Sequence, residues 1–285
     1  MNIVLICVAL GGIWAGYELI SRARRRAKRR LALGQPFPDE WVQILQSNLP
    51  PYANFGRELR RELHQDIQVF LEEKSFEGCG GLSITDEIRV TIAAQACMLL
   101  LNREDRCYPR LRSVVVYPST YVAGGKGLFG GKSTARSTRL GESWGAGAVV
   151  LSWSNVKQGA FNFSDGHNVT MHEFAHQVDQ EDGAADGAPI LERRSAYSTW
   201  AKVFSKEFAQ LQQKARRRKR SVFDAYGATN PAEFFAVATE CFFEKPRQLQ
   251  KKHPELYEEL RDYYKVHPVD WLKPHGPSQP SEATP

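Results

Sequence analysis

The spacing of apolar residues predicts that much of this chain is helical. Apolar side chains recur at intervals of three and four along residues 53–74 and again along residues 85–101, which is the period of a helix with one buried face. Residues 190–213 and 231–243 are two further helix candidates. The chain therefore has at least four segments with helical patterning.

Two short runs rich in β-branched residues predict strands. Residues 114–117 form the first run and are followed directly by Pro118, and residues 148–153 form the second. Ser164 or Asp165 then offers an N-cap for the helix that follows the second strand. A strand followed closely by a helix is expected in this part of the chain.

The amino-terminal segment predicts a membrane anchor. Residues 3–20 are mostly apolar, although glycines and Glu18 interrupt them, and the basic run 21–30 follows at once. This length is near the lower limit for a helix that spans a bilayer, for which about 17 residues can suffice. Because basic flanks stay in the cytoplasm, we expect a single-pass protein of the inner (cytoplasmic) membrane with the domain that follows the anchor in the cytoplasm. The alternative is a cytoplasmic protein with a peripheral helix.

We expect four parts in this chain of 285 residues. Its hydrophobic content of 42% and charged content of 25% are ordinary for a globular protein. The tail contains Pro, Ser and Gly and is expected to be disordered. The expected parts are a transmembrane anchor (1–20), a basic juxtamembrane linker (21–38), a main domain (39–272) and the disordered tail (273–285).

The net charge of +6 comes from two basic runs and not from the whole chain. Residues 21–30 carry seven positive charges and residues 214–220 carry six, so the chain without the first run is nearly neutral. The second run contains no aromatic residue that could stack on a base, so we expect a solvated helix end or loop and no nucleic-acid partner. The five cysteines include no C-x-x-C pair, which argues against a disulfide framework and a cysteine zinc site.

The strongest chemical signal is the sequence HEFAH at residues 172–176. His172 and His176 share one helix face, with about 5–6 Å between their Cβ atoms, so both imidazoles can reach one metal ion. Glu173 follows the first histidine and lies near enough to take a proton from a water on that metal. This H-E-x-x-H pattern indicates the zinc site of a metallopeptidase, which needs three protein ligands and a water.

Three carboxylates qualify as the third ligand. Asp182 lies ten residues after His172, where metzincins have their last ligand, but Asp179 occupies the position where metzincins have a glycine. Glu233 and Glu240 are seven residues apart and therefore lie on one face of the last predicted helix. Glu233 has a second explanation, because a capping box also places a glutamate at this position in the first turn. The chemistry of the residues leaves the choice between Glu233 and Glu240 open.

Two sequence blocks resemble the Mlc titration factor A family of zinc peptidases. They are HEFAHQVD at residues 172–179 and DAYGATNPAEFFAV at residues 224–237, and ECFF at residues 240–243 continues the second block. The similarity extends from about Pro36 to Trp271. The second block is the more specific of the two.

The resemblance implies a gluzincin-like α+β metalloprotease domain, mainly helical with a small sheet. It also implies that His172, His176 and Glu233 bind one zinc ion per chain and that Glu173 is the general base.

Three further residues receive roles from the resemblance. Tyr226, seven residues before the third ligand, matches the tyrosine that stabilises the transition state in related gluzincins. Glu240 and Asp179 become candidates for orienting the histidines from outside the ligand set.

The resemblance supports two hypotheses about function. The first is a zinc-dependent peptidase that acts on peptide or protein substrates, with aminopeptidase activity as a more specific form. The second is a protein that sequesters a transcriptional regulator and has little or no catalysis. Familiar members of the family resemble soluble cytosolic proteins, so the expected membrane anchor is a departure from them.

Overall fold

The computed structural model describes most of the chain, from the end of the apolar segment to the end of the main domain. The described residues are 16, 19–20, 23–24, 26–103, 108–119 and 147–272. The expected disordered tail, 273–285, lies outside them. The expected boundaries between anchor, linker and domain are not tested by the structure.

The prediction of an amino-terminal transmembrane helix is wrong. Within the described ranges, no helix is long and apolar enough to cross a bilayer. Of the segment proposed as the anchor, only Gly16, Leu19 and Ile20 are described, and the rest lies outside the described residues. The physical reason is visible in the sequence, because glycines and the charge of Glu18 interrupt an apolar run that is already near the minimum length.

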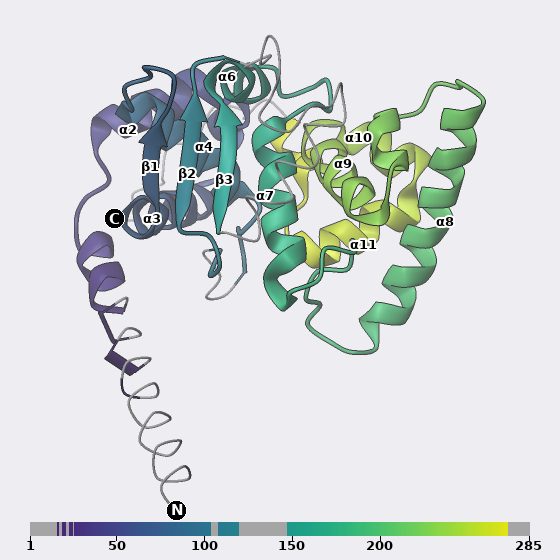
Figure 1. Cartoon of the computed structure of the whole chain (residues 1–285), viewed down its shortest axis with the longest axis horizontal. Coiled ribbons are helices and arrows are strands. Elements are labelled where there is room, and N and C mark those ends of the chain that lie inside the picture. The colour runs from purple at the N-terminus through teal and green to yellow at the C-terminus, as the bar shows by residue number, and fades with distance from the viewer. Residues whose placement is uncertain are drawn as a thin grey trace, which may run out of the picture.

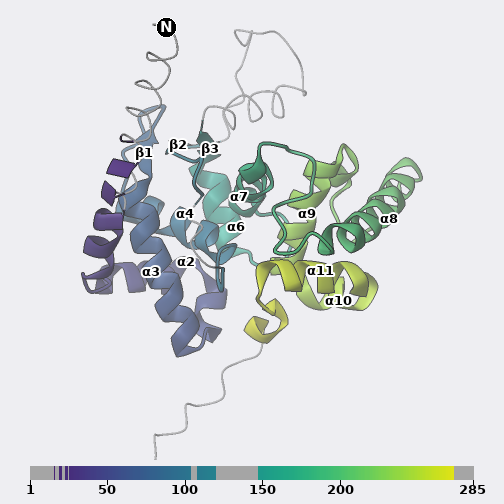
Figure 2. The same cartoon turned by 90° about the horizontal axis from the view of Figure 1, so that it is seen from below.

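A small parallel sheet forms one part of the fold. Its strands are β1 (Ser75–Gly78), β2 (Ser113–Tyr117) and β3 (Ala148–Ser152), paired in the order β1-β2-β3. Strands β2 and β3 alternate between buried and half-buried residues, so one face of the sheet is packed on the core. Figure 2 shows helices α3, α4 and α6 on the same side of this sheet.

The helices of the amino-terminal half confirm the two segments predicted from apolar spacing. The first predicted helix is α3 and the second is α4, which is buried along nearly its whole length because it packs against α2, α3, α6 and α7. The elements of this half are α2 (Asp39–Asn48), the 3-10 helix η1 (Pro50–Asn54), α3 (Arg57–Glu73), α4 (Asp86–Met98) and α6 (Trp153–Phe161).

Helix α7 lies between the sheet and the carboxyl-terminal helices (Figure 1). It contacts β3, α4 and α6 on one side and α9 on the other. The elements from here to the end are α7 (Val169–Asp179), η2 (Gln180–Asp182), α8 (Ala196–Arg216), η3 (Ala225–Ala228), α9 (Pro231–Glu244), α10 (Pro246–Lys252), α11 (Pro254–Tyr264) and η4 (Pro268–Leu272).

Helix α9 begins where the sequence predicts. Asn230 accepts a hydrogen bond from the Glu233 N–H at 2.9 Å, and Pro231 takes the first helical position, where its missing N–H costs nothing. The helix is apolar on almost every side, which is typical of a helix enclosed by the core. Its few carboxylates are therefore exceptions that need partners.

Candidate metal centre

Helix α7 begins at Asn168 and not at the predicted caps. The Asn168 Oδ1 atom accepts a hydrogen bond from the Met171 N–H at 3.0 Å. Asp165 instead accepts a hydrogen bond from the His167 N–H at 2.9 Å, which closes a local turn. Gly166 makes this turn with a φ of 73°, a conformation that favours glycine. The prediction of Ser164 or Asp165 as the cap is therefore wrong by a few residues.

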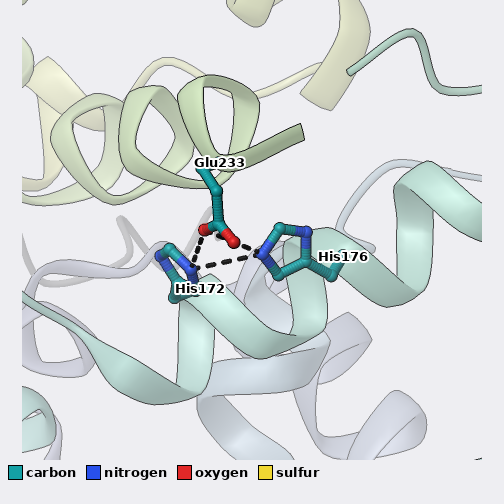
Figure 3. A group of neighbouring side chains, drawn as sticks. All are labelled: His172, His176 and Glu233. Atoms are coloured by element: carbon teal, nitrogen blue, oxygen red, sulfur yellow. Dashed lines mark hydrogen bonds and ion pairs between the residues drawn. The ribbon is translucent and has the colours of Figure 1, made fainter. Parts of the chain in front are cut away.

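His172, His176 and Glu233 converge at the interface between α7 and α9 (Figure 3). The two histidine Nε2 atoms are 3.2 Å apart. The Glu233 Oε2 atom lies 3.0 Å from His172 Nε2 and 3.3 Å from His176 Nε2. Three potential ligand atoms from helices distant in sequence thus form a compact triangle.

The shape of this triangle fits a small divalent cation. Two ligands bound at about 2.0–2.1 Å to a tetrahedral ion are separated by about 3.3–3.4 Å, and the three observed separations are close to that edge. Two imidazoles and one carboxylate are also a donor set used for catalytic zinc, which leaves a fourth position for water. Among the described residues, this is the group of histidines and carboxylates placed to hold a metal.

Burial and mutual hydrogen bonds shift the pKa values of these three residues. Burial opposes the charged form of His172, but hydrogen bonds to Glu233 and Glu240 raise its pKa to about 10. Burial lowers the pKa of His176 to about 4. Burial disfavours the charged form of Glu233, yet hydrogen bonds from both histidines hold its pKa well below the usual range. A metal ligand has to be deprotonated, so metal binding by these residues depends on pH.

Two carboxylates further along α9 tie the start of α7 to that helix. The Glu240 Oε1 atom is 2.7 Å from His172 Nδ1, and its Oε2 atom accepts a hydrogen bond from the Asn168 N–H at 2.6 Å. Glu244 accepts hydrogen bonds from the Gly166 N–H at 2.8 Å, from the His167 N–H at 3.1 Å and from the Asn168 amide at 3.1 Å. Burial raises the pKa of Glu244 to about 8.

Glu173 and Tyr226 lie beside the triangle. The Glu173 side chain is buried on α7, and its charge contributes to the raised pKa of His172. The Tyr226 hydroxyl donates a hydrogen bond to Glu233 Oε1 at 3.1 Å. Tyr226 belongs to η3 and is 40% exposed, whereas His176 and Glu233 are buried. A buried carboxylate and an accessible phenol therefore flank the potential ligands.

The sequence matches the glucose-regulated metallo-peptidase M90 family over residues 22–265. The chain belongs to this family. An uncharacterized protein of Synechocystis is 43% identical over 240 residues, which cover 82% of this chain and 86% of that protein. Mlc titration factor A of Klebsiella pneumoniae is 29% identical over 241 residues, which cover 83% and 89% of the two chains. Mlc titration factor A of Serratia proteamaculans is 30% identical over 208 residues, which cover 71% and 78%.

Membership of the M90 family confirms the resemblance drawn from the two sequence blocks. It indicates a metallopeptidase, and the triangle of His172, His176 and Glu233 provides a group that can hold the metal ion. The names of the Klebsiella and Serratia relatives refer to the titration of Mlc and do not mention catalysis.

The remaining acidic candidates occupy other places in this M90 protein. Asp182 is exposed in η2, where it accepts a hydrogen bond from the Ala184 N–H at 2.9 Å, and it does not belong to the triangle. Asp179 is buried at the end of α7 and accepts a hydrogen bond from the Gly187 N–H at 3.0 Å, so it holds the following loop against the helix. Burial raises the pKa of Asp179 to about 7.

The sequence reasoning missed Asn168 and Glu244. A signal for Glu244 was present, because it follows Glu233 by eleven residues and Glu240 by four, a spacing that places three carboxylates on one face of an apolar helix. Asn168 had no comparable signal, since Ser164 and Asp165 are equally good caps in sequence terms.

One cavity of the described region lies apart from the metal centre. It has a volume of about 1190 Å³ and is lined by residues 190–196 together with parts of α8 and α11, but by none of the residues discussed above. The chemistry of the donor atoms, and not the size of a cavity, therefore identifies the candidate site.

Proposed function

We propose that this protein is a zinc-dependent peptidase that hydrolyses peptide bonds in peptide or protein substrates. The observation that carries the proposal is the triangle of His172, His176 and Glu233, whose edges suit a tetrahedral cation. Glu173, the glutamate of the H-E-x-x-H sequence, lies on the same helix. A closed structural zinc site would not require this glutamate.

His172, His176 and Glu233 are the proposed ligands, and Glu173 is the proposed general base. A zinc ion bound here would polarise the scissile carbonyl and lower the pKa of a water molecule. Glu173 takes the proton of the attacking water and passes it to the leaving amine.

Tyr226 is the proposed stabiliser of the tetrahedral oxyanion. Its hydroxyl is a hydrogen-bond donor that already points to Glu233 Oε1, at the rim of the ligand triangle. Because the ring belongs to the short and exposed η3 segment, a small movement can bring the hydroxyl to a substrate oxygen. Loss of one such donor typically costs about 3–4 kcal/mol of transition-state stabilisation.

Glu240 and Asp179 support the site from outside. Glu240 accepts the proton of His172 Nδ1, which leaves Nε2 as the atom that faces the metal. Asp179 fixes the loop after α7 through Gly187. We place the catalytic domain at residues 39–272, because the buried core is continuous from Leu45 to Trp271.

Metal analysis and peptide cleavage by the full chain test this proposal. Glu173→Gln is expected to keep one zinc ion per chain and to abolish turnover, whereas Glu233→Gln is expected to lose zinc as well. Glu207→Gln is the matched control, because Glu207 is also buried and lies 2.7 Å from a histidine, His253, but does not belong to the metal group. Normal hydrolysis by Glu173→Gln would show that the base is assigned wrongly.

The same assay determines the type of peptidase. Each peptide is offered with a free and with an acetylated amino terminus. An aminopeptidase cleaves only the free form, because it has to hold the terminal amine. An endopeptidase cleaves both forms.

A second function is favoured by the names of the relatives. Two proteins that share most of their length with this chain are named for the titration of Mlc, and on that ground we propose that this chain also binds a transcriptional regulator. Wild-type protein and Glu173→Gln serve as baits for a DNA-binding regulator. Retention of the same regulator by both baits shows that binding is independent of catalysis, and retention by neither removes the second function.

A further inference from the structure

A group of exposed positive charges ends helix α8 and is not used by the proposed mechanism. We call residues 214–220 the basic segment; it carries six positive charges and no acidic residue. Residues 216–220 are exposed. Cations near a helix C-terminus interact favourably with the helix dipole, but this effect is confined to the last turn, and Arg217 to Arg220 lie beyond the end of α8.

The basic segment follows the part of α8 that packs against η3, the 3-10 helix that carries Tyr226. Gly227 follows Tyr226 and lies so close to α8 that a Cβ atom on it would be 3.2 Å from Leu211 Cδ2. The Gln212 side chain donates a hydrogen bond to the Ala228 carbonyl oxygen at 3.3 Å. Arg216 is five residues beyond Leu211, which is about 7–8 Å along the helix axis. Figure 1 shows the chain turning back from this end of α8 toward α9.

The basic segment is one of the two runs that give this chain its positive net charge. The net charge is +6, and the runs 21–30 and 214–220 contribute seven and six positive charges, so all other residues together carry a net charge of −7. The described part of the first run lies on the opposite side of the molecule from α8 in Figure 1. An acidic ligand on this side of the molecule is therefore attracted to the basic segment.

We propose that the basic segment binds an acidic stretch of the peptide substrate while the neighbouring residues of that substrate occupy the metal centre. This proposal rests on the proposed peptidase function. An extended peptide advances about 3.3 Å per residue, so a tract three to six positions from the cleaved bond lies about 10–20 Å from it. A peptide is favoured over a nucleic acid because the basic segment has no aromatic side chain for stacking on bases.

The test compares two fluorogenic peptides that differ only in the tract three to six residues from the cleaved bond. One peptide has Asp and Glu in this tract and the other has Asn and Gln. With the full zinc-loaded chain at low salt, we expect kcat/KM to be about tenfold higher for the acidic peptide, within the range of electrostatic steering. The preference should disappear at about 0.5 M salt, because exposed charges are then screened.

Two variants with equal loss of charge localise the effect. Four neutralisations in the basic segment (Arg216→Gln, Arg217→Gln, Lys219→Gln and Arg220→Gln) should remove the preference and leave cleavage of the neutral peptide unchanged. The control variant neutralises four exposed arginines of the amino-terminal half and should keep the preference for the acidic peptide. Its substitutions are Arg24→Gln, Arg26→Gln, Arg57→Gln and Arg61→Gln. An equal preference in both variants would overturn the proposal.

Binding measurements separate this proposal from the proposed function. Fluorescence anisotropy of the labelled acidic peptide is measured with the wild-type chain and the basic-segment variant. Selective binding of the acidic peptide without cleavage refutes the proposed peptidase function and supports the basic segment as the binding surface. Cleavage without selectivity supports the peptidase function and refutes the role of the basic segment. Stronger competition by a single-stranded oligonucleotide or by phosphatidylserine vesicles than by unlabelled acidic peptide would assign the basic segment to nucleic acid or lipid and overturn the proposal.

Discussion

Replacement of Glu244 by Gln is expected to change how the stability of the protein depends on pH. The Glu244 side chain is only 3% exposed and holds the turn before α7 through the backbone N–H groups of Gly166 and His167. It also accepts a hydrogen bond from the side chain of Asn168, the residue that caps α7. The carboxylate thus connects α9 with the beginning of the helix that carries both histidines.

The magnitude follows from the pKa of this group. Burial raises the pKa of Glu244 from an ordinary 4.5 to about 8, so the folded state binds the proton more tightly than the unfolded state does. The stabilisation by this proton is complete below the unfolded pKa and is lost as pH rises through the folded pKa. Between pH 6.5 and 8.5 the linkage relation gives a loss of about 2 kcal/mol from this one group.

Urea denaturation of the full chain in a chelating buffer measures the effect. The wild-type protein should lose stability between pH 6.5 and 8.5, and Glu244→Gln should lose about 2 kcal/mol less over the same window, because an amide does not titrate. Near-UV circular dichroism at pH 6.5 checks that the variant has the native fold. Parallel curves for the two proteins would refute the assigned burial and proton uptake of Glu244.

Three further substitutions test the proposed site. Glu240→Gln should weaken zinc binding about 10–100-fold in a chelator competition, and unchanged affinity would contradict this. The reason is that His172 and Asn168 contact different oxygens of Glu240, and the amide nitrogen that replaces one of them cannot accept a hydrogen bond. Tyr226→Phe should lower kcat by about 100-fold or more and leave zinc content and KM nearly unchanged. A kcat equal to that of the wild-type protein would show that Tyr226 does not stabilise the oxyanion. Asn168→Ala should reduce the free energy of unfolding by at least about 1 kcal/mol through loss of the α7 cap, a loss that denaturation at pH 6.5 would reveal or exclude.

The helices predicted from apolar spacing agree with the structure because the spacing records burial directly. Helices α3 and α4 lie within the predicted segments 53–74 and 85–101. The predicted helix 190–213 instead begins at Ala196, since residues 190–195 form a loop whose composition resembles that of the helix. The short strand β1 has no recognisable pattern in four residues, and only its pairing with β2 reveals it.

The third member of the metal group shows the limit of local patterns. Glu233 and Glu240 share one face of α9, so helical periodicity treats them alike. In the structure, Glu233 reaches the Nε2 atom of His172 and Glu240 reaches the Nδ1 atom of the same ring. The position of α9 along α7 decides which carboxylate joins the triangle, and no residue pattern within α9 contains that information.

By itself, the sequence determined that His172 and His176 share one helix face and that α9 starts at Pro231, because both depend only on neighbouring residues. It also determined which family the chain resembles, because that resemblance lies in two contiguous blocks. Only the tertiary structure decided that Glu233 completes the triangle, that Asn168 caps α7 and that Glu244 supports this cap. The contacts of Glu233 and Glu244 join residues more than sixty positions apart, and they exist because the packing of the core brings two helices to one particular offset.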